Sequence, residues 1–199
     1  MDCVLIGYFP KQRMTRSQWR SPYPDYPDAG FPSPDPVEEI CSASNCIAKG
    51  PDSWNEAVPF NYFGGFDSLA SALRVLPADL RHDFDVFAYR MAPILFRDGQ
   101  AEELEVPEQI LEPLPVTFEC IGCDAVELRG YGRGCSPLSC NGQAGEGEVV
   151  VNRYCLVATQ SEAIELARRF SDTKPEPGPY CVVEVWKGCS RVSQHRSGI

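Results

Sequence analysis

Pairs of cysteines are the residues of this chain whose type and spacing can do chemistry. The sequence of 199 residues has ten cysteines and only two histidines. Two thiols close together in a chain can bind a metal ion, act as a redox couple or form a disulfide. Three segments carry such a pair: CSASNC at 41–46, CIGC at 120–123 and CSPLSC at 135–140.

A zinc site built from two of these pairs is the metal hypothesis that the spacing favours. Four thiolates can complete a tetrahedron around zinc, with each close pair on one edge. The predicted ligands are Cys120, Cys123, Cys135 and Cys140. Two alternatives stay open: the pair at 41–46 takes the place of one of these pairs, or the thiols are reduced and pack as small hydrophobic side chains. Burial of the latter kind is also expected for Cys155 and Cys181, which lie in predicted strands.

Signatures of catalysis are weak by comparison. A cysteine nucleophile needs a histidine base, but His82 is predicted on the polar side of a helix and His195 in a frayed tail. A redox role for CIGC needs a thiol at a helix N-terminus, whereas the residues after it, DAVELRGYG, are typical of a short strand and a turn. The glycine-containing stretches match neither G-x-S-x-G nor a phosphate-binding loop. The sequence therefore favours a binding protein over an enzyme.

The stretch from Ser136 to Asn152 is rich in short polar side chains. Such side chains can satisfy the backbone of a turn or hold a ligand. The candidates for cofactor contacts here are Ser136, Ser139 and Asn141. The alternative is a structural loop of the Ω type, held together by its own side chains.

Composition narrows the class of partner. The formal net charge of −10 argues against direct binding of nucleic acid, which needs a basic surface. The first apolar stretch is too short for a secretory signal, and no run approaches the ~18 apolar residues of a membrane span. We therefore expect a cytoplasmic protein with reduced thiols. Its expected partner is another protein rather than nucleic acid or a membrane, and the sequence leaves the oligomeric state open.

The predicted fold is one α+β domain over residues 1–199. Its parts are a helical, loop-rich front portion at 1–97, an acidic connector with prolines at 98–115, a β-rich portion at 116–190 and a frayed tail at 191–199. The front portion is expected to contain a strand, a surface loop and two helices. Their ranges are 3–9 for the strand, 21–36 for the loop with its six prolines, and 67–76 and 78–91 for the helices.

The C-terminal half is predicted to form a mixed β-sheet with one covering helix. A capping box of Thr159 and Glu162, in which each side chain satisfies a free backbone N–H, marks the start of a helix at 160–170. The apolar stretches on either side, 149–158 and 180–186, are typical of strands. Together they predict a right-handed strand–helix–strand crossover.

Three motifs of the chain resemble those of an uncharacterised family of bacterial proteins. They are CSASNC near the front, SPLSCNG in the second half and PEPGPYCVVEVW near the end. The resemblance covers most of the chain and implies a bacterial, cytoplasmic origin, but no mechanism. The CIGC pair lies outside this pattern.

A shorter stretch is similar to the late part of small ADP-ribosyltransferase-like domains. Its pieces are CLVAT, SEAIELARRF and YCVVEVW, about thirty residues in all. The resemblance implies NAD binding, with Tyr89, Arg90 or the segment 136–139 as contacts and Glu184 as a cofactor-binding acid. The sequence thus favours an acidic cytoplasmic interaction or accessory protein with a structural cysteine cluster that can bind zinc. The alternative function is an NAD- or nucleotide-using transferase.

Overall fold

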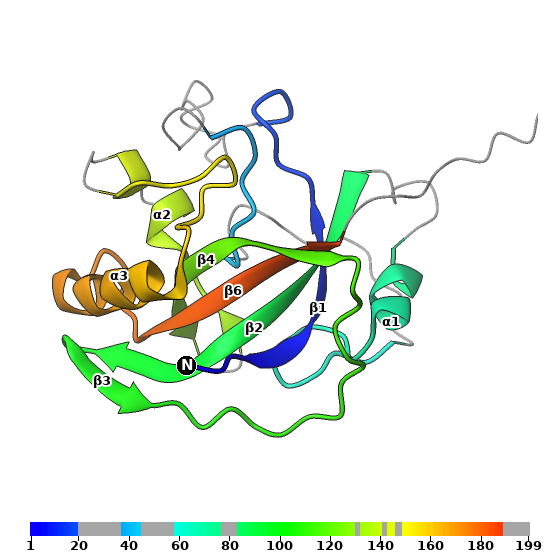
Figure 1. Cartoon of the computed structure of the whole chain (residues 1–199), viewed down its shortest axis with the longest axis horizontal. Helices are drawn as coiled ribbons and strands as arrows, with labels where there is room; N and C mark the ends of the chain where they lie inside the picture. The colour runs from blue at the N-terminus through cyan, green and yellow to red at the C-terminus, as the bar shows by residue number, and fades with distance from the viewer. Residues whose placement is uncertain are drawn as a thin grey trace, which may run out of the picture.

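Antiparallel pairing joins the strands of this protein into one sheet (Figure 1). The computed structural model describes residues 1–19, 37–44, 58–76, 83–129, 132–140, 143–145 and 149–188. Within these ranges the strands are β1 (Val4–Gln12), β2 (Phe84–Arg97), β3 (Gln100–Glu103), β4 (Phe118–Arg129), β5 (Gly132–Arg133) and β6 (Tyr180–Gly188). The order across the sheet is β1-β2-β6-β4-β5, and β3 pairs with the end of β2 that β1 leaves free.

Short helices lie at the two ends of this sheet (Figure 1). They are α1 (Leu69–Arg74), α2 (Pro137–Cys140), a 3-10 turn (Gln143–Gly145) and α3 (Gln160–Thr173). The helix α3 begins at the predicted capping box: the Glu162 N–H donates to Thr159 Oγ1 at 3.2 Å, and the Thr159 N–H donates to Glu162 Oε2 at 2.8 Å. No helix in the described ranges is long and apolar enough to cross a membrane.

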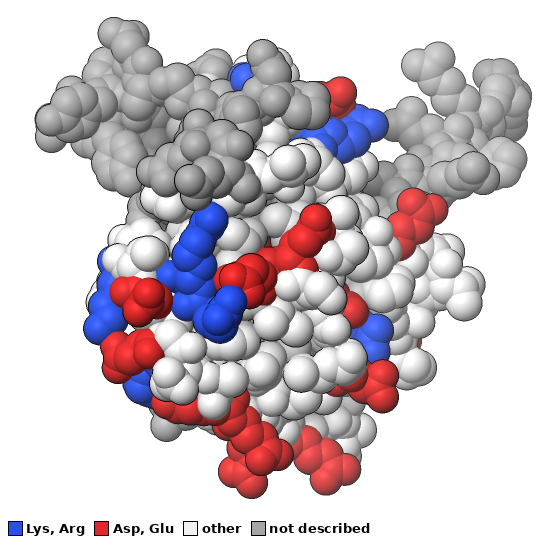
Figure 2. Space-filling view, turned by 60° about the vertical axis from the view of Figure 1, so that its left-hand side comes forward, with Lys and Arg blue, Asp and Glu red and all other residues white. Residues whose placement is uncertain are grey.

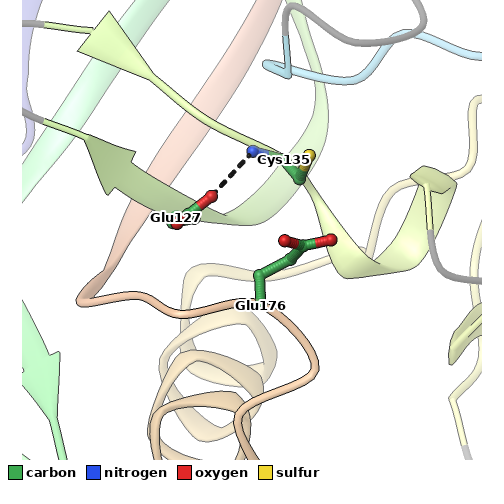
Figure 3. A group of neighbouring side chains, drawn as sticks. All are labelled: Glu127, Cys135 and Glu176. Atoms are coloured by element: carbon green, nitrogen blue, oxygen red, sulfur yellow. Dashed lines mark hydrogen bonds between the residues drawn. The ribbon is translucent and has the colours of Figure 1, made fainter.

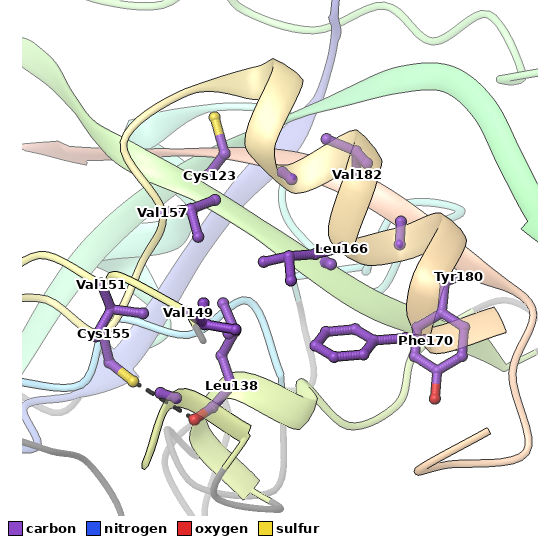
Figure 4. Close-up of a cluster of buried hydrophobic side chains, with 14 of the residues drawn as sticks. Cys123, Leu138, Val149, Val151, Cys155, Val157, Leu166, Phe170, Tyr180 and Val182 are labelled. Carbon is purple, nitrogen blue, oxygen red and sulfur yellow. Dashed lines mark hydrogen bonds between the residues drawn. The ribbon is translucent and has the colours of Figure 1, made fainter. Parts of the chain in front are cut away.

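Packing between α3 and the sheet forms the largest core cluster (Figure 4). The helix buries its apolar side chains, Leu166 and Phe170 among them, against Tyr180 and Val182 of β6. The rings of Phe170 and Tyr180 lie 5.8 Å apart. Burial of such aromatic and aliphatic side chains supplies the main favourable free energy of folding.

The predicted helical front portion is wrong. Among the described residues before position 98, α1 is the only α-helix, and it has six residues. The helix expected at 78–91 is described only from residue 83 onward, and there the chain forms β2 from Phe84. β2 has buried side chains on both faces, and a strand buried on both faces reads as a continuous apolar run that periodicity cannot tell from a helix.

The predicted mixed sheet with a covering helix is also wrong. Every strand pair in the described residues is antiparallel, and α3 packs over one end of β4 and β6 instead of crossing between two parallel strands (Figure 1). The stretch 149–158 is not a strand, because Asn152 closes it into a tight loop. The Asn152 Oδ1 atom accepts the N–H of Tyr154 at 2.9 Å and that of Leu156 at 3.3 Å.

The expected burial of Cys155 and Cys181 is confirmed, whereas two other predicted segments lie outside the described residues. Cys155 is 1% exposed and Cys181 is fully buried. Cys181 lies in β6 as predicted, but Cys155 lies in the loop that Asn152 closes. The proline-rich loop at 21–36 and the tail at 191–199 lie outside the described residues.

A bulge in β4 turns both cysteines of CIGC to the same face of the sheet. The pairing partners in β6 are Trp186 for Cys120 and Glu184 for Cys123, with a register shift between 120 and 122. Partners two residues apart on one strand share a face, so Cys120 and Cys123 share it too. Gly122 permits the bulge, because its φ of +142° suits glycine.

Gly122→Ala is expected to destabilise the protein by about 2–5 kcal/mol, through backbone strain and overpacking. An added Cβ would lie 2.8 Å from both Leu156 Cβ and Val157 O. The matched control is Gly64→Ala, which also has a positive φ, +71°, but has no atom within 4 Å of the added Cβ. It is expected to cost only about 1 kcal/mol. Urea unfolding measures both, and equal losses would contradict the packing argument.

Candidate metal centre and the buried network beside it

The three cysteine motifs meet at one carboxylate, that of Asp124. Asp124 directly follows CIGC and is fully buried. It accepts hydrogen bonds from Ser42 Oγ at 3.0 Å, from the Ala43 N–H at 2.9 Å and from Ser136 Oγ at 2.6 Å. These donors come from CSASNC and CSPLSC, so serines and backbone, rather than cysteines, join the motifs.

A buried ammonium group faces the same segment from the other side. Lys11 of β1 is 2% exposed. Its Nζ atom donates to the carbonyl oxygens of Ser42 at 3.4 Å, of Ala43 at 3.2 Å and of Ser44 at 2.6 Å. The segment therefore presents hydrogen-bond donors to Asp124 and carbonyl oxygens to Lys11. Burial raises the pKa of Asp124 above its usual value, and the donors and the Lys11 charge oppose that rise.

The candidate metal centre consists of Glu127, Cys135 and Glu176 (Figure 3). One ligand atom from each residue lies within 4.8 Å of those of the other two. In the part of the chain that the structure describes, no other three histidine, cysteine, aspartate or glutamate side chains meet this condition. Glu127 is 2% exposed, and the other two residues are half-buried.

Backbone hydrogen bonds hold Cys135 beside Glu127. The Glu127 N–H donates to the Cys135 carbonyl at 2.9 Å, and the Gly134 N–H donates to the Glu127 carbonyl at 2.7 Å. The Cys135 N–H also donates to Glu127 Oε2 at 3.3 Å (Figure 3). The segment around Cys135 thus runs along β4 like a short added strand, and this pairing fixes the distance between the thiol and the first carboxylate.

The arrangement suits a divalent cation. A thiolate and two carboxylates supply three ligand atoms, and their negative charges more than balance that of the ion. Ligand atoms on tetrahedral zinc, with bonds of about 2.0–2.3 Å, lie about 3.3–3.8 Å apart. Side-chain rotations that move each ligand atom by less than about 1 Å would shorten the 4.8 Å separations to those of a tetrahedral zinc site. The Glu-Cys-Glu group can therefore hold a metal ion.

Only one of the four cysteines predicted to bind zinc belongs to this group. Cys135 does, whereas Cys120 is exposed on β4 and Cys123 is buried against the α3 core. Cys140 is half-buried at the end of α2, with its Sγ 3.5 Å from Ser44 Oγ. The described residues bring only Cys135 of these four into a group of potential ligands, and the four-cysteine site stays a prediction.

Two of the residues predicted to contact a cofactor are neighbours, because Ser139 Oγ donates to the Ser136 carbonyl at 3.4 Å, whereas Glu184 lies in β6. Ser136 and Ser139 are fully buried, and Ser136 serves Asp124. Glu184 of β6 accepts hydrogen bonds from Arg90 at 3.3 Å and from Trp186 Nε1 at 3.2 Å. Asn141 lies outside the described residues.

Sequence reasoning missed two of the three residues in the metal group. Glu127 could have been noticed in the sequence, because a glutamate between the apolar residues Val126 and Leu128 is unusual in a buried strand. Glu176 stands in PEPGPY, whose prolines and glycine are typical of a turn and give no sign of a metal ligand. Their approach depends on the pairing of β4 with β6, which places Glu127 opposite Tyr180. That pairing joins residues more than fifty positions apart, beyond the reach of local patterns.

Comparisons with family models, with curated proteins and with solved structures gave no match. The resemblances to a bacterial family and to ADP-ribosyltransferase-like domains therefore stay expectations. One piece of the second, CLVAT at 155–159, belongs to a loop and a helix start rather than a strand. The functional argument depends on the geometry of the site.

Asp124→Ala is expected to destabilise the protein by about 3–5 kcal/mol, because three buried donors lose their acceptor. The control, Ser136→Ala, removes one donor and leaves the carboxylate two others, so it should cost about 1–2 kcal/mol. Denaturant unfolding followed by circular dichroism checks the difference. A loss below 1 kcal/mol for Asp124→Ala would refute the structural role of the network.

Proposed function

We propose that the protein is an acidic interaction or accessory protein whose fold is stabilised by zinc bound to Glu127, Cys135 and Glu176. The observation that carries this proposal is the approach of these three ligand atoms to within 4.8 Å. They come from β4, from the segment before α2 and from the loop before β6. A shared ion would link these segments and stabilise the native state by mass action.

Zinc is the cation that this donor set favours. A thiolate is a soft ligand, which magnesium and calcium bind poorly because they prefer all-oxygen sites. Zinc accepts sulfur and carboxylate oxygen together. Three protein ligands leave one coordination position for a water molecule or for a donor from a partner.

Surface charge supports a basic protein as the partner. Acidic side chains gather along the lower edge of the face in Figure 2. β3 and the connector after it carry five exposed glutamates between positions 102 and 112. We call them the acidic ribbon: Glu102, Glu103, Glu105, Glu108 and Glu112. Such a surface steers basic partners and repels nucleic acid.

Zinc binding is expected at one ion per chain, Cys135→Ser should remove it, and Glu176→Gln should weaken it while leaving a measurable affinity. Cys140→Ser is the matched control, because that half-buried thiol lies five residues away and outside the group. Metal analysis after dialysis and a thermal melt with and without zinc provide the measurements. Zinc at ~100 times its dissociation constant should add about 2.7 kcal/mol of stability.

Affinity for zinc should also rise with pH, because the thiol must lose its proton to bind. A wild-type chain that binds no zinc at pH 8 would contradict the proposal. Equal loss of zinc in Cys140→Ser would instead favour the cysteine site predicted from the sequence.

Neutralising the acidic ribbon should weaken binding of a basic peptide. Glu103→Gln, Glu105→Gln and Glu108→Gln together are expected to lower affinity for decalysine about tenfold at low salt. A variant with the same change in charge on other surfaces, Glu119→Gln with Glu165→Gln and Asp172→Asn, serves as the control. Fluorescence anisotropy compares them, and equal weakening in both would show that net charge alone matters.

A further inference from the structure

The motif PEPGPY forms a loop that closes on the hydroxyl of its own tyrosine. The Glu176 N–H donates to Tyr180 Oη at 2.9 Å, and the same hydroxyl donates to the Glu176 carbonyl at 2.9 Å. Both backbone groups of Glu176 are thus held by one side chain four residues further along. Figure 3 shows the Glu176 carboxylate directed toward Cys135 and Glu127.

We propose that Tyr180 is the positioning residue of the metal centre, holding the Glu176 backbone so that its carboxylate is available as a ligand. The inference rests on the proposed function, since it assigns a role at the same zinc site. Tyr180 does not bind the ion; it acts through Glu176.

The position of Tyr180 is fixed independently of any metal. Its side chain is fully buried and packs on Phe170 of α3. It lies opposite Glu127 in the pairing of β4 with β6.

The sequence of the loop matches this arrangement. A Cβ at Gly178 would lie 2.5 Å from the Tyr180 ring, so the chain can pass over the ring only at a glycine. The prolines at 175, 177 and 179 restrict the backbone on each side. The Leu128 N–H donates to the Pro179 carbonyl at 2.8 Å, which ties the loop to β4 next to Glu127.

A rigid loop matters because the three ligands come from separate segments. Ligand residues held by outer hydrogen bonds lose less freedom on binding, and removing such a partner lowers metal affinity 10–100-fold in known sites. Glu127 and Cys135 are already fixed by backbone pairing. Tyr180 supplies the equivalent restraint for the third ligand.

Tyr180→Phe tests the inference, since it keeps the buried ring and removes only the hydroxyl. We expect zinc affinity, measured by competition with a chromogenic chelator, to fall 10–100-fold. Tyr62→Phe, which removes an exposed hydroxyl, should leave zinc affinity unchanged. Gly178→Ala provides a second variant: it displaces the ring while keeping the hydroxyl, and should also weaken binding.

A double variant separates positioning from a general loss of structure. If Tyr180 acts through Glu176, then Tyr180→Phe should add no further loss in a Glu176→Gln background. Cobalt substitution gives a second readout, because Tyr180→Phe should keep the thiolate-to-cobalt absorption while altering the visible bands that depend on the carboxylate.

Each outcome decides between the two proposals. A wild-type chain without zinc affinity overturns both. Zinc binding that depends on Glu176 but not on Tyr180 preserves the zinc site and overturns the positioning role. Additive losses in the double variant overturn it as well, because they would mean that Tyr180 acts elsewhere.

Discussion

The contact between Lys11, the backbone of residues 42–44 and Asp124 is the constraint on which the rest of the structure depends. A charge buried without partners costs several kcal/mol, so each of these two groups requires full hydrogen bonding. The segment provides it by offering carbonyl oxygens to Lys11 and donors to Asp124. This contact joins β1 to β4, which are not neighbours in the sheet. An incorrect register of either strand would leave a buried charge without partners.

The same network reaches the candidate metal centre through Cys135 and Ser136, which are adjacent in the chain. Asp124 and Glu127 are three positions apart on β4, so their side chains point to opposite faces of the sheet. Ser136 donates to Asp124, while Cys135 pairs with Glu127. The segment after β5 therefore contacts both faces of β4 with consecutive side chains. A displacement of Ser136 would carry the thiol with it, which makes the buried network part of the metal site's support.

Sequence patterns correctly predicted the elements that depend on a few neighbouring residues. The capping box at Thr159 and the return strand at 180–186 both depend on a few neighbouring residues, and both are present. The failures have long-range causes. β2 has buried side chains on both faces, so its apolar residues show no period that excludes a helix. The stretch 149–158 has the composition of a strand, but the amide of Asn152 closes a loop that no periodicity reveals. The metal group was predicted only through Cys135, because its glutamates come near that thiol only when β4 and β6 pair.

The surroundings of each cysteine determine how well its thiol suits a metal ion. The eight cysteines in the described ranges are free thiols, and most are buried. Burial and the nearby charge of Glu184 raise the pKa of Cys3 to about 11, and burial raises that of Cys123 to about 12. Such thiols stay protonated at neutral pH and pack as small hydrophobic side chains, since only the thiolate is a good nucleophile or metal ligand. Cys135 differs because two carboxylates lie within 4.8 Å of it, and a cation there would favour its deprotonation. Among the described cysteines, Cys135 is therefore the thiol whose acidic neighbours suit a metal ion.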